Sequence, residues 1–528
     1  MKLVFINIYP DETIARYLLS SYVLFAYISK YYPQKDFFEI KILNFPNTIN
    51  PQKISDSILK ENPDIVSYSC YVWNIKIILN VIENLQFKLS CIQIFGGPDI
   101  SPEKIKTTFQ NFQTQTYFIF GEGERKFVNL LKFLVLNNHP SLFPCGVAYW
   151  QNNETYFTPD HDHITNLDEI PSVYLENIID ERLYAYQQAF LETQRGCHFR
   201  CKYCVYHKNN AKITYYSEQR IFDELDFLIQ IKKIKALRIF DSIFTTDLSR
   251  AKNIVKYLIG LKKKQIALPW IYWEFTYNSI DEEFFSLVSE LKTETHIANS
   301  TLLTALDRPQ HYSDMLSGYT AINCIGIQSF SDAALKAVSR PKINKEKFQN
   351  FMNLVSRYNL VLKMDMILGL PDETQESYFD GLEYLIRFFK NTDHILNIHR
   401  LQMLPGSDLE KSIIPKMIDF SKEAPYYVRS TNCFTLSEMN HAATLTAVLF
   451  RIINSPLRSS FFELKESRTE SLRDLLESLF FELSKVPEIR DAQLFQNGGV
   501  DDNYWNGKIY SEISTSVLLL VIDQMMVT

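Results

Sequence analysis

The 528-residue sequence lacks an apolar run long enough to cross a membrane. A late run, SVLLLVI at 516–522, falls well short of the roughly 20 apolar residues that a transmembrane helix needs. The first residues, MKLVFINIYPDE, hold one lysine and a short apolar stretch, which indicates a buried strand rather than a signal peptide. From these features we expect a soluble, cytoplasmic protein without a membrane partner.

The sequence also lacks blocks of charge of one sign. Its 55 lysine and arginine residues are mixed with 61 aspartate and glutamate residues, which gives a net charge of −6. Because nucleic-acid binding needs a basic patch that neutralises phosphates, we expect no nucleic-acid partner. Apolar residues make up 46% of the chain, which is typical of a packed globular protein. The length suits about two to four domains.

Export signals are absent too, so the eight cysteines are expected in a reducing compartment. Such cysteines serve as metal ligands or catalytic groups more often than as disulfides. Only three of them are clustered. The other five lie in apolar, strand-like contexts and are predicted to be small buried hydrophobic residues: Cys70, Cys91, Cys145, Cys324 and Cys433.

Short apolar runs alternate with amphipathic segments over residues 1–140, which predicts a doubly wound α/β domain with a parallel sheet. Ligands of such domains lie beyond the carboxyl ends of the strands. Three expected strand ends carry small and polar residues, SYSCYVWN, GGPDIS and GEGE. Turn chemistry explains any one of them, whereas three on one edge favour a ligand site. The candidate residues are Ser67, Ser69, Trp73, Gly96, Gly97, Pro98, Gly121 and Glu122.

The remaining chain divides into a linker and two further regions. Residues 141–186 are polar and are predicted to connect domains, with DHDH as a solvated segment. Residues 187–410 contain six strand-helix units, which predicts a partial (β/α)6 barrel with its chemistry at the strand ends. Residues 292–320 exceed what one connection needs and are interpreted as a substrate lid or a decoration. Residues 411–528 are expected to be mostly helical.

The segment RGCHFRCKYC sets three cysteines, Cys197, Cys201 and Cys204, in C-x₃-C-x₂-C spacing. A structural zinc site normally has four protein ligands, so either a distant ligand completes this set or one position stays open. The only local donors are His198 and His207. In a [4Fe–4S] cluster, three thiolates leave one iron free for a substrate or cofactor.

The three cysteines, with Tyr203 before the last one and a predicted barrel strand before the first, resemble the motif of the radical S-adenosylmethionine (SAM) superfamily. The resemblance implies that these cysteines bind a [4Fe–4S] cluster and that SAM chelates its open iron. It further implies reductive cleavage of SAM to a 5′-deoxyadenosyl radical. A flavodoxin-type or ferredoxin-type protein would supply the electron.

Later segments are similar to other motifs of the superfamily. RIFDSIF, YWEFTY, GIQSF, AVSRP and MILGLPDET follow the cysteines in the order that the superfamily shows. The resemblance implies that Asp241 lies near the methionyl end of SAM, and that Arg340 pairs with its carboxylate. The residues implied to bind SAM are Asp241, Glu274, Gln328, Ser329, Arg340, Ile367 and Gly369.

The first domain resembles that of the cobalamin-binding subclass, which implies that its three strand ends hold cobalamin. Domains that ligate cobalt from below use an Asp-x-His-x-x-Gly segment. This sequence has YPDETIARY there, and no histidine precedes His139. A missing lower ligand agrees with the radical subclass and equally with a domain that has lost cobalamin.

The resemblance implies a cobalamin-dependent radical SAM methyltransferase that methylates an unactivated carbon of a peptide or small-metabolite substrate. The alternative is a cobalamin-binding radical enzyme with a non-methylating reaction, such as ring contraction, cyclisation or hydrogen abstraction. A radical enzyme with an empty first domain, and a zinc protein without catalytic activity, stay open as further alternatives. No side chain is assigned a catalytic role.

Overall fold

The computed structural model describes residues 1–10, 16–34, 36–109, 115–135, 143–151, 154–186, 188–206, 212–291, 321–412, 417–454, 457–487 and 515–527. The segment 292–320, interpreted as a lid or decoration, lies outside the described residues. The chain divides into two compact units. Unit 1 comprises residues 1–199, 204–242 and 404–410, and unit 2 comprises residues 200–203, 243–403 and 411–528.

Unit 1 contains a seven-stranded sheet of order β2-β1-β3-β4-β5-β6-β7. Its parallel strands are β1 (Lys2–Tyr9), β2 (Glu39–Pro46), β3 (Ile65–Ser69), β4 (Ile92–Gly96) and β5 (Thr116–Ile119). The strand order and the parallel pairing confirm the doubly wound α/β prediction. The antiparallel strands β6 (Val147–Gln151) and β7 (Glu154–Phe157) extend this sheet, so part of the predicted linker belongs to it.

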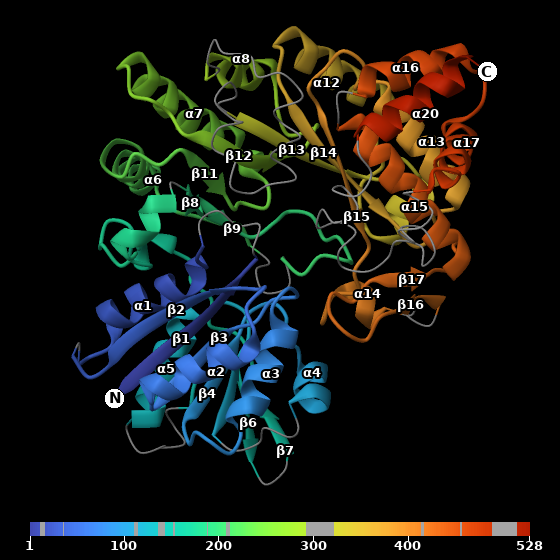
Figure 1. The fold of residues 1–528 in the computed structure, drawn as a ribbon. Helices are drawn as coiled ribbons and strands as arrows, with labels where there is room; N and C mark the ends of the chain where they lie inside the picture. Colours follow the sequence, from blue (N-terminus) through green and yellow to red (C-terminus); the bar gives the residue numbers. More distant parts are fainter. Residues whose placement is uncertain are drawn as a thin grey trace. The chain divides into compact units, whose positions relative to one another are not determined.

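Helices connect the parallel strands of this sheet: α1 (Leu19–Tyr31), α2 (Pro51–Glu61), α3 (Ile75–Leu85), α4 (Pro102–Thr108) and α5 (Glu124–Val135). Helix α1 packs against α5, and α2 packs against α3, as Figure 1 also shows. The starts of the helices follow from local sequence. Asn50 caps α2 with Pro51 in its first turn, and Ser101 caps α4 in the same way.

Short helices η2 (Leu167–Glu169) and η3 (Glu181–Tyr186) lie in the rest of the connector. The structure assigns six strands to the second sheet: β8 (Gln188–Leu191), β11 (Ala236–Ile239), β12 (Trp270–Phe275), β13 (Ala321–Gln328), β14 (Leu362–Leu368) and β15 (Ile395–Arg400). In unit 1, β8 pairs in parallel with β11. In unit 2, the pairs β12–β13, β13–β14 and β14–β15 are all parallel. Six parallel strands confirm the prediction for the barrel region.

The helices of this region follow its strands in the chain: α6 (Glu218–Asp226), the π-helical η4 (Phe227–Ile231), η5 (Phe244–Thr246), α7 (Leu248–Lys263), α8 (Glu282–Glu290), α11 (Asp332–Ala337), α12 (Lys345–Arg357), α13 (Gln375–Ile386) and α14 (Asp408–Lys411). Between β8 and β11, the short strands β9 (Gln194–Arg195) and β10 (Thr214–Tyr215) form an antiparallel pair. The cysteine segment lies between these two strands.

The C-terminal region is mostly helical, as predicted. It contains α15 (Leu436–Ile453), α16 (Arg458–Ser467), α17 (Leu472–Ser484) and α20 (Thr515–Val527), preceded by a hairpin of β16 (Asp419–Phe420) and β17 (Val428–Ser430). Helix α15 packs against β15, and α17 packs against α13 and α15 (Figure 1). No helix in the described part of the chain is both long and apolar enough to cross a bilayer. The bounds of the four predicted domains stay a prediction.

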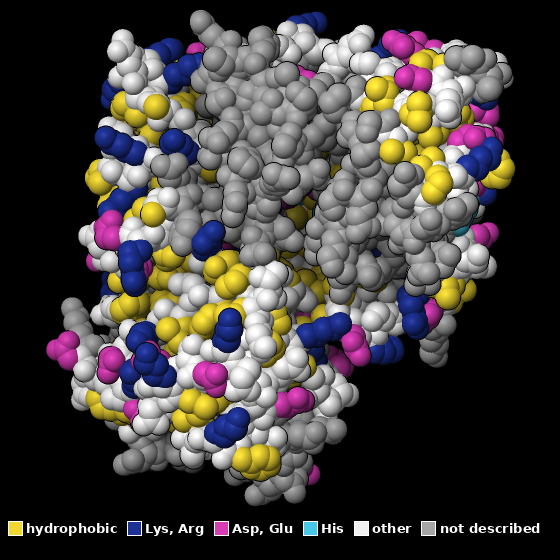
Figure 2. All heavy atoms as spheres, in the orientation of Figure 1, with side chains coloured by type: hydrophobic (Ala, Val, Ile, Leu, Met, Phe, Trp, Pro, Cys, Tyr) yellow, Lys and Arg dark blue, Asp and Glu magenta, His cyan; other side chains and the backbone are white. Residues whose placement is uncertain are grey.

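Charged side chains of both signs are interspersed on the face drawn in Figure 2, over the atoms that are coloured there. This distribution agrees with the mixed charge pattern of the sequence.

Candidate functional site

The cysteine segment begins with a sharp turn at Gly196. This residue has φ +94°, and a Cβ placed on it would lie 2.8 Å from the carbonyl oxygen of Lys212. A side chain at 196 would therefore be both strained and obstructed. Ser242 supports the turn from β11, because its hydroxyl donates a hydrogen bond to the carbonyl of Gly196 at 2.7 Å.

The sulfur atoms of Cys201 and Cys204 accept hydrogen bonds. The guanidinium Nη1 of Arg340 lies 3.4 Å from Cys201 Sγ, and the backbone N–H of Tyr206 donates to Cys204 Sγ, also at 3.4 Å. Donors to sulfur stabilise thiolates, which are the form that binds iron. The residues present therefore suit a [4Fe–4S] cluster.

No three described His, Cys, Asp or Glu side chains are arranged to hold a single metal ion. A cluster differs in this respect, because each cysteine binds a separate iron. None of the eight cysteines, all of which lie in the described part of the chain, forms a disulfide. Cys70, Cys91 and Cys324 are buried as predicted, but Cys145 and Cys433 are only half-buried, which corrects the prediction. Both lie in loops, one before β6 and one before α15, where apolar neighbours in the sequence do not guarantee burial.

Asp241, after β11, is almost completely buried. Its Oδ1 accepts hydrogen bonds from the backbone N–H groups of Thr193 and Gln194, at 2.7 and 3.1 Å. Its Oδ2 accepts one from the hydroxyl of Thr193. The carboxylate thus fixes the chain that leads into the cysteine segment. Its role toward SAM stays a prediction, and these contacts give it a structural role that the sequence did not reveal.

Strand β13 ends irregularly at the predicted SAM residue Gln328. The register with β14 shifts between Gly326 and Gln328, and Gln328 has φ +70°, which is unfavourable for a residue with a side chain. A Cβ on Gly326 would lie 2.3 Å from Gln328 Nε2, so the amide folds back over the glycine. Nη2 of Arg340 donates to the Gly326 carbonyl at 2.7 Å. Arg340 therefore links the end of β13 to Cys201.

Ser329 faces the interior, and its side chain is completely buried. Its hydroxyl donates a hydrogen bond to Glu373 and accepts one from the N–H of Ser331 at 2.9 Å. Burial raises the pKa of Glu373 to about 8, and its Oε2 has no hydrogen-bond partner in the part of the chain that the structure describes. The sequence did not single out Glu373, since nothing in LPDET marks it as buried.

Ile367 and Gly369 lie at the end of β14, as predicted. The register pairs Ile367 with His399 of β15. Gly369 has φ +92°, and a Cβ there would lie 2.8 Å from Cε of Met439 in α15. The backbone conformation and the packed methionine both require glycine at this position.

Polar side chains form a row across strands β12 to β15. At one end, Glu274 of β12 is paired with Cys324 of β13 and accepts a hydrogen bond from the hydroxyl of Tyr272 at 3.1 Å. The centre of the row is Asp365 of β14. It accepts hydrogen bonds from Cys324 Sγ at 3.4 Å and from Asn397 at 2.9 Å. Lys363 and His399 lie 3.7 and 3.6 Å from its oxygens.

Burial would raise the pKa of Asp365, but the opposing effects of Lys363 and His399 are larger and hold it well below its usual value. Asp365 is therefore ionised at neutral pH. The side chain of His399 is 57% exposed, so this row presents a polar, charged group beside Ile367.

The strand ends of the first domain are packed by the protein itself. Ser67 is buried inside β3, and the hydroxyl of Ser69 lies 3.2 Å from that of Ser20. Trp73 stacks on Tyr71 and donates to the carbonyl of Ile8 at 3.1 Å, while 37% of it stays exposed.

The loop after β4 approaches the loop after β3. Gly97 has φ +113°, and a Cβ there would lie 2.4 Å from the carbonyl oxygen of Cys70. The N–H of Cys70 donates to the carbonyl of Gly96 at 2.7 Å, and Pro98 is exposed. Close approach of backbone to backbone therefore explains Gly97 without a ligand, whereas a Cβ on Gly96 would meet only ordinary contacts, the nearest at 3.8 Å. Their role toward cobalamin stays a prediction.

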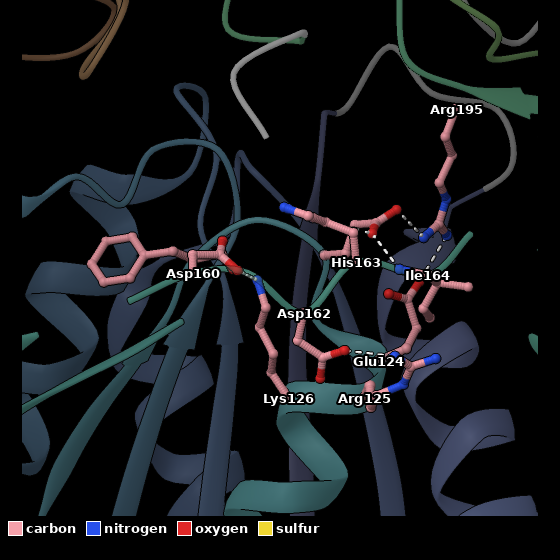
Figure 3. Close-up of polar contacts among 10 residues, drawn as sticks. Glu124, Arg125, Lys126, Asp160, Asp162, His163, Ile164 and Arg195 are labelled. Carbon is pink, nitrogen blue, oxygen red and sulfur yellow. Dashed lines mark hydrogen bonds and ion pairs between the residues drawn. The ribbon is translucent and has the colours of Figure 1, made fainter. Parts of the chain in front are cut away.

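The loop after β5 contains Gly121, with φ +67°, and Glu122. Oε2 of Glu122 accepts the N–H of Ile164 at 3.1 Å, and Oε1 accepts Nη1 of Arg195 at 3.3 Å (Figure 3). Both carboxylate oxygens are thus occupied by protein donors, and one donor comes from the residue two before Cys197. The sequence did not reveal this contact, although Arg195 stands directly beside the cysteine motif.

Comparisons with known proteins agree with this geometry. Residues 191–385 match the sequence family described as the Radical SAM superfamily. The chain is 25% identical over 367 residues to the cobalamin-dependent radical SAM methyltransferase TokK of Streptomyces tokunonensis, covering 68% of this chain and 49% of TokK. It is 24% identical over 357 residues to the 2-(S-pantetheinyl)-carbapenam-3-carboxylate methyltransferase of Streptantibioticus cattleyicolor, covering 66% and 48%. The chain therefore spans about half the length of these curated relatives.

Two solved structures share the fold. The cobalamin-dependent S-adenosylmethionine radical enzyme OxsB has a TM-score of 0.63 at 16% identity, over 100% of this chain and 79% of OxsB. The radical S-adenosylmethionine methyltransferase TsrM from Kitasatospora setae has a TM-score of 0.57 at 13% identity, over 83% of this chain and 82% of TsrM. At such identities the likeness establishes the fold alone.

Proposed function

We propose, on the premise that this chain belongs to the radical SAM superfamily, that it is a cobalamin-dependent methyltransferase acting on an unactivated carbon of a peptide or small metabolite. The observation that carries the proposal is the extent of the likeness to TokK. The 367 aligned residues exceed the span 191–385, so the similarity reaches beyond the radical SAM segment into other parts of the chain.

The proposed cofactors are a [4Fe–4S] cluster, SAM and cobalamin. Together they would supply radical generation and a transferable methyl group. The protein would hold and orient them. Cys197, Cys201 and Cys204 are the proposed cluster ligands, and Arg340 would orient the carboxylate of SAM with its planar, bidentate guanidinium. Gln328, Ile367 and Gly369 would support the nucleoside, since they lie at the ends of β13 and β14.

The row around Asp365 supports a polar substrate. Asp365 would keep Lys363 and His399 oriented for hydrogen bonding to that substrate, because it lies within ion-pair distance of both. Glu274 of β12, which is paired with Cys324 of β13, would offer a further hydrogen-bond acceptor to the substrate. A flavodoxin-type or ferredoxin-type donor would provide the electron in the cytoplasm, a reducing compartment that suits a chain without disulfides among its eight cysteines.

Anaerobic reconstitution with iron, sulfide and hydroxocobalamin tests the proposal, followed by absorption spectra and product analysis with SAM and candidate substrates. We expect an iron–sulfur chromophore, retained cobalamin, and both 5′-deoxyadenosine and S-adenosylhomocysteine. Failure to retain cobalamin would contradict the proposal. If 5′-deoxyadenosine forms without S-adenosylhomocysteine, the result would favour a non-methylating radical reaction over the proposed methyl transfer.

A matched pair of cysteine variants controls for the cluster. Cys201→Ala should lose the chromophore and both products, because it removes a proposed ligand. Cys433→Ala removes a half-buried thiol outside the cysteine segment and should keep both. If Cys201→Ala retains activity, the cluster assignment is wrong.

A further inference from the structure

Arg195 lies at the centre of a buried cluster of carboxylates immediately before the cysteine segment. Its Nη1 lies 3.3 Å from Glu122, its Nη2 lies 2.7 Å from Glu124, and its Nε lies 3.0 Å from Glu192. The side chain of Arg195 is 12% exposed, and those of Glu122 and Glu124 are 8% and 7% exposed. Figure 3 shows the guanidinium of Arg195 directed toward Glu124.

The three carboxylates come from two distant parts of the sequence. Glu122 lies in the loop after β5, the last parallel strand of the first sheet, and Glu124 is the first residue of α5, whereas Glu192 follows β8. Arg195 itself pairs with Thr214 in the β9–β10 ladder, which frames the cysteine segment. Through these ion pairs, Glu122 and Glu124 of the first domain contact Arg195, two residues before the first cysteine of that segment.

Carboxylates outnumber guanidinium groups in this cluster, and His163 Nδ1 also lies 3.9 Å from Glu122 Oε2. One guanidinium faces three carboxylates, and a buried charge is costly unless it is paired. Burial would raise the pKa of Glu124, but Arg195 outweighs this effect and the pKa lies below its usual value. Burial raises the pKa of Glu192, so this residue takes up a proton more readily than Glu124 does. Arg195 stands two residues before Cys197 in the sequence, so the charges of this cluster adjoin the cysteine segment.

We propose that Arg195 is a positioning residue that holds the start of the cysteine segment against the first domain and, with Glu122, Glu124 and Glu192, sets the reduction potential of the cluster. The inference rests on the proposed function, because it needs a [4Fe–4S] cluster at Cys197, Cys201 and Cys204. The potential of such a cluster depends on the net charge, hydrogen bonding and solvent exposure around it. The first domain would then influence radical generation through charge as well as through cobalamin.

Removing a positive side chain and removing a negative one should shift the midpoint potential of the iron–sulfur cluster in opposite directions. Arg195→Gln removes a positive charge, which makes addition of an electron to the cluster less favourable and lowers the midpoint potential. Glu124→Gln removes a negative charge and raises it. Proton uptake by Glu192 reduces the size of the first shift without reversing it. A residue with a merely structural role would not produce shifts of opposite sign.

The neighbouring Arg125 provides a matched control. It lies on α5, as Glu124 does, and pairs with Asp162 of the connector at 2.5 Å (Figure 3). It also pairs with Glu169 of the connector at 3.0 Å. These partners do not belong to the cysteine segment. Arg125→Gln therefore removes a similar half-buried ion pair, and we expect it to leave the midpoint potential unchanged.

The experiment is an anaerobic redox titration of the reconstituted full chain, with the reduced cluster followed by electron paramagnetic resonance in the absence of SAM. The sign pattern described above supports the inference. Shifts of the same sign for Arg195→Gln and Glu124→Gln, or no shift relative to Arg125→Gln, would overturn it. If Arg195→Gln does not retain iron, two other variants still test the inference. Glu124→Gln must raise the midpoint potential, and Arg195→Lys, which keeps the positive charge, must leave it near that of the unchanged protein. Any other outcome would show that the inference is wrong. Absence of any cluster in the unchanged protein would instead refute the proposed function.

Discussion

The guanidinium of Arg340 contacts Cys201 Sγ at 3.4 Å and the carbonyl oxygen of Gly326 at 2.7 Å, although Arg340 and Cys201 are 139 residues apart in the sequence. One side chain thereby connects a proposed cluster ligand to the strand end proposed to hold SAM. The arginine is well placed to respond to both cofactors.

Replacing Arg340 by glutamine should weaken SAM binding. A hydrogen bond between charged groups contributes about 1.5–3 kcal/mol, so the SAM concentration for half-maximal 5′-deoxyadenosine formation should rise about 10- to 100-fold. The chromophore should persist, because the cysteines remain. Arg387→Gln, on the exposed end of α13, is the control and should leave SAM binding unaltered. Equal SAM dependence for the two variants would exclude the proposed role of Arg340.

Two substitutions at Asp241 separate its structural role from a role in SAM binding. Asp241→Ala leaves two buried backbone N–H groups without an acceptor, which should reduce the free energy of unfolding by about 2–5 kcal/mol. Asp241→Asn keeps an oxygen for both N–H groups and should cost much less. The measurement is chemical denaturation followed by SAM titration of the stable variant. Loss of SAM binding in Asp241→Asn, with stability retained, would assign the carboxylate to SAM. Normal binding would assign it to the cysteine segment alone.

Glu373 should make stability depend on pH. Its pKa in the folded protein is about 8, above the ordinary value of 4.5, so the folded state keeps a proton that the unfolded state releases. The contribution to stability is fully present below about pH 4.5 and is lost as pH rises through about 8. We expect Glu373→Gln, which cannot ionise, to have a higher Tm than the unchanged protein at alkaline pH and a similar Tm in acid. A constant Tm difference across this range would contradict the assignment.

Alanine at position 369 should destabilise the protein through two effects. It places a Cβ 2.8 Å from Met439 Cε and holds a side chain at φ +92°, which together should cost about 1–3 kcal/mol. Shortening the methionine relieves only the first effect. Thermal unfolding of Gly369→Ala, Met439→Ala and the double variant should show that the double variant loses less stability than the sum of the single ones. Simple additivity would mean that the two residues do not compete for space.

The sequence predicted the fold well because apolar periodicity reports directly on strands and helices. It also placed Ile367 and Gly369 at the end of a barrel strand, which the structure shows as β14. It could not reveal which side chains pair, because the partners are distant: Ser329 and Glu373 are 44 residues apart, and Arg195 and Glu122 are 73 apart. Small and polar residues after β3, β4 and β5 were interpreted as ligand contacts. At Gly97 and Glu122 the structure shows protein partners instead, since a tight turn and a ligand site favour the same residue types.

The contact between Met439 and Gly369 limits how far this chain can be shortened. Helix α15 follows the last strand of the barrel region, and a design that stopped at residue 410 would remove the methionine that fills the space above a proposed SAM-binding turn. The exposed turn would lose its apolar cover and would face water. The smallest fragment that retains a complete SAM site should therefore extend through residue 453.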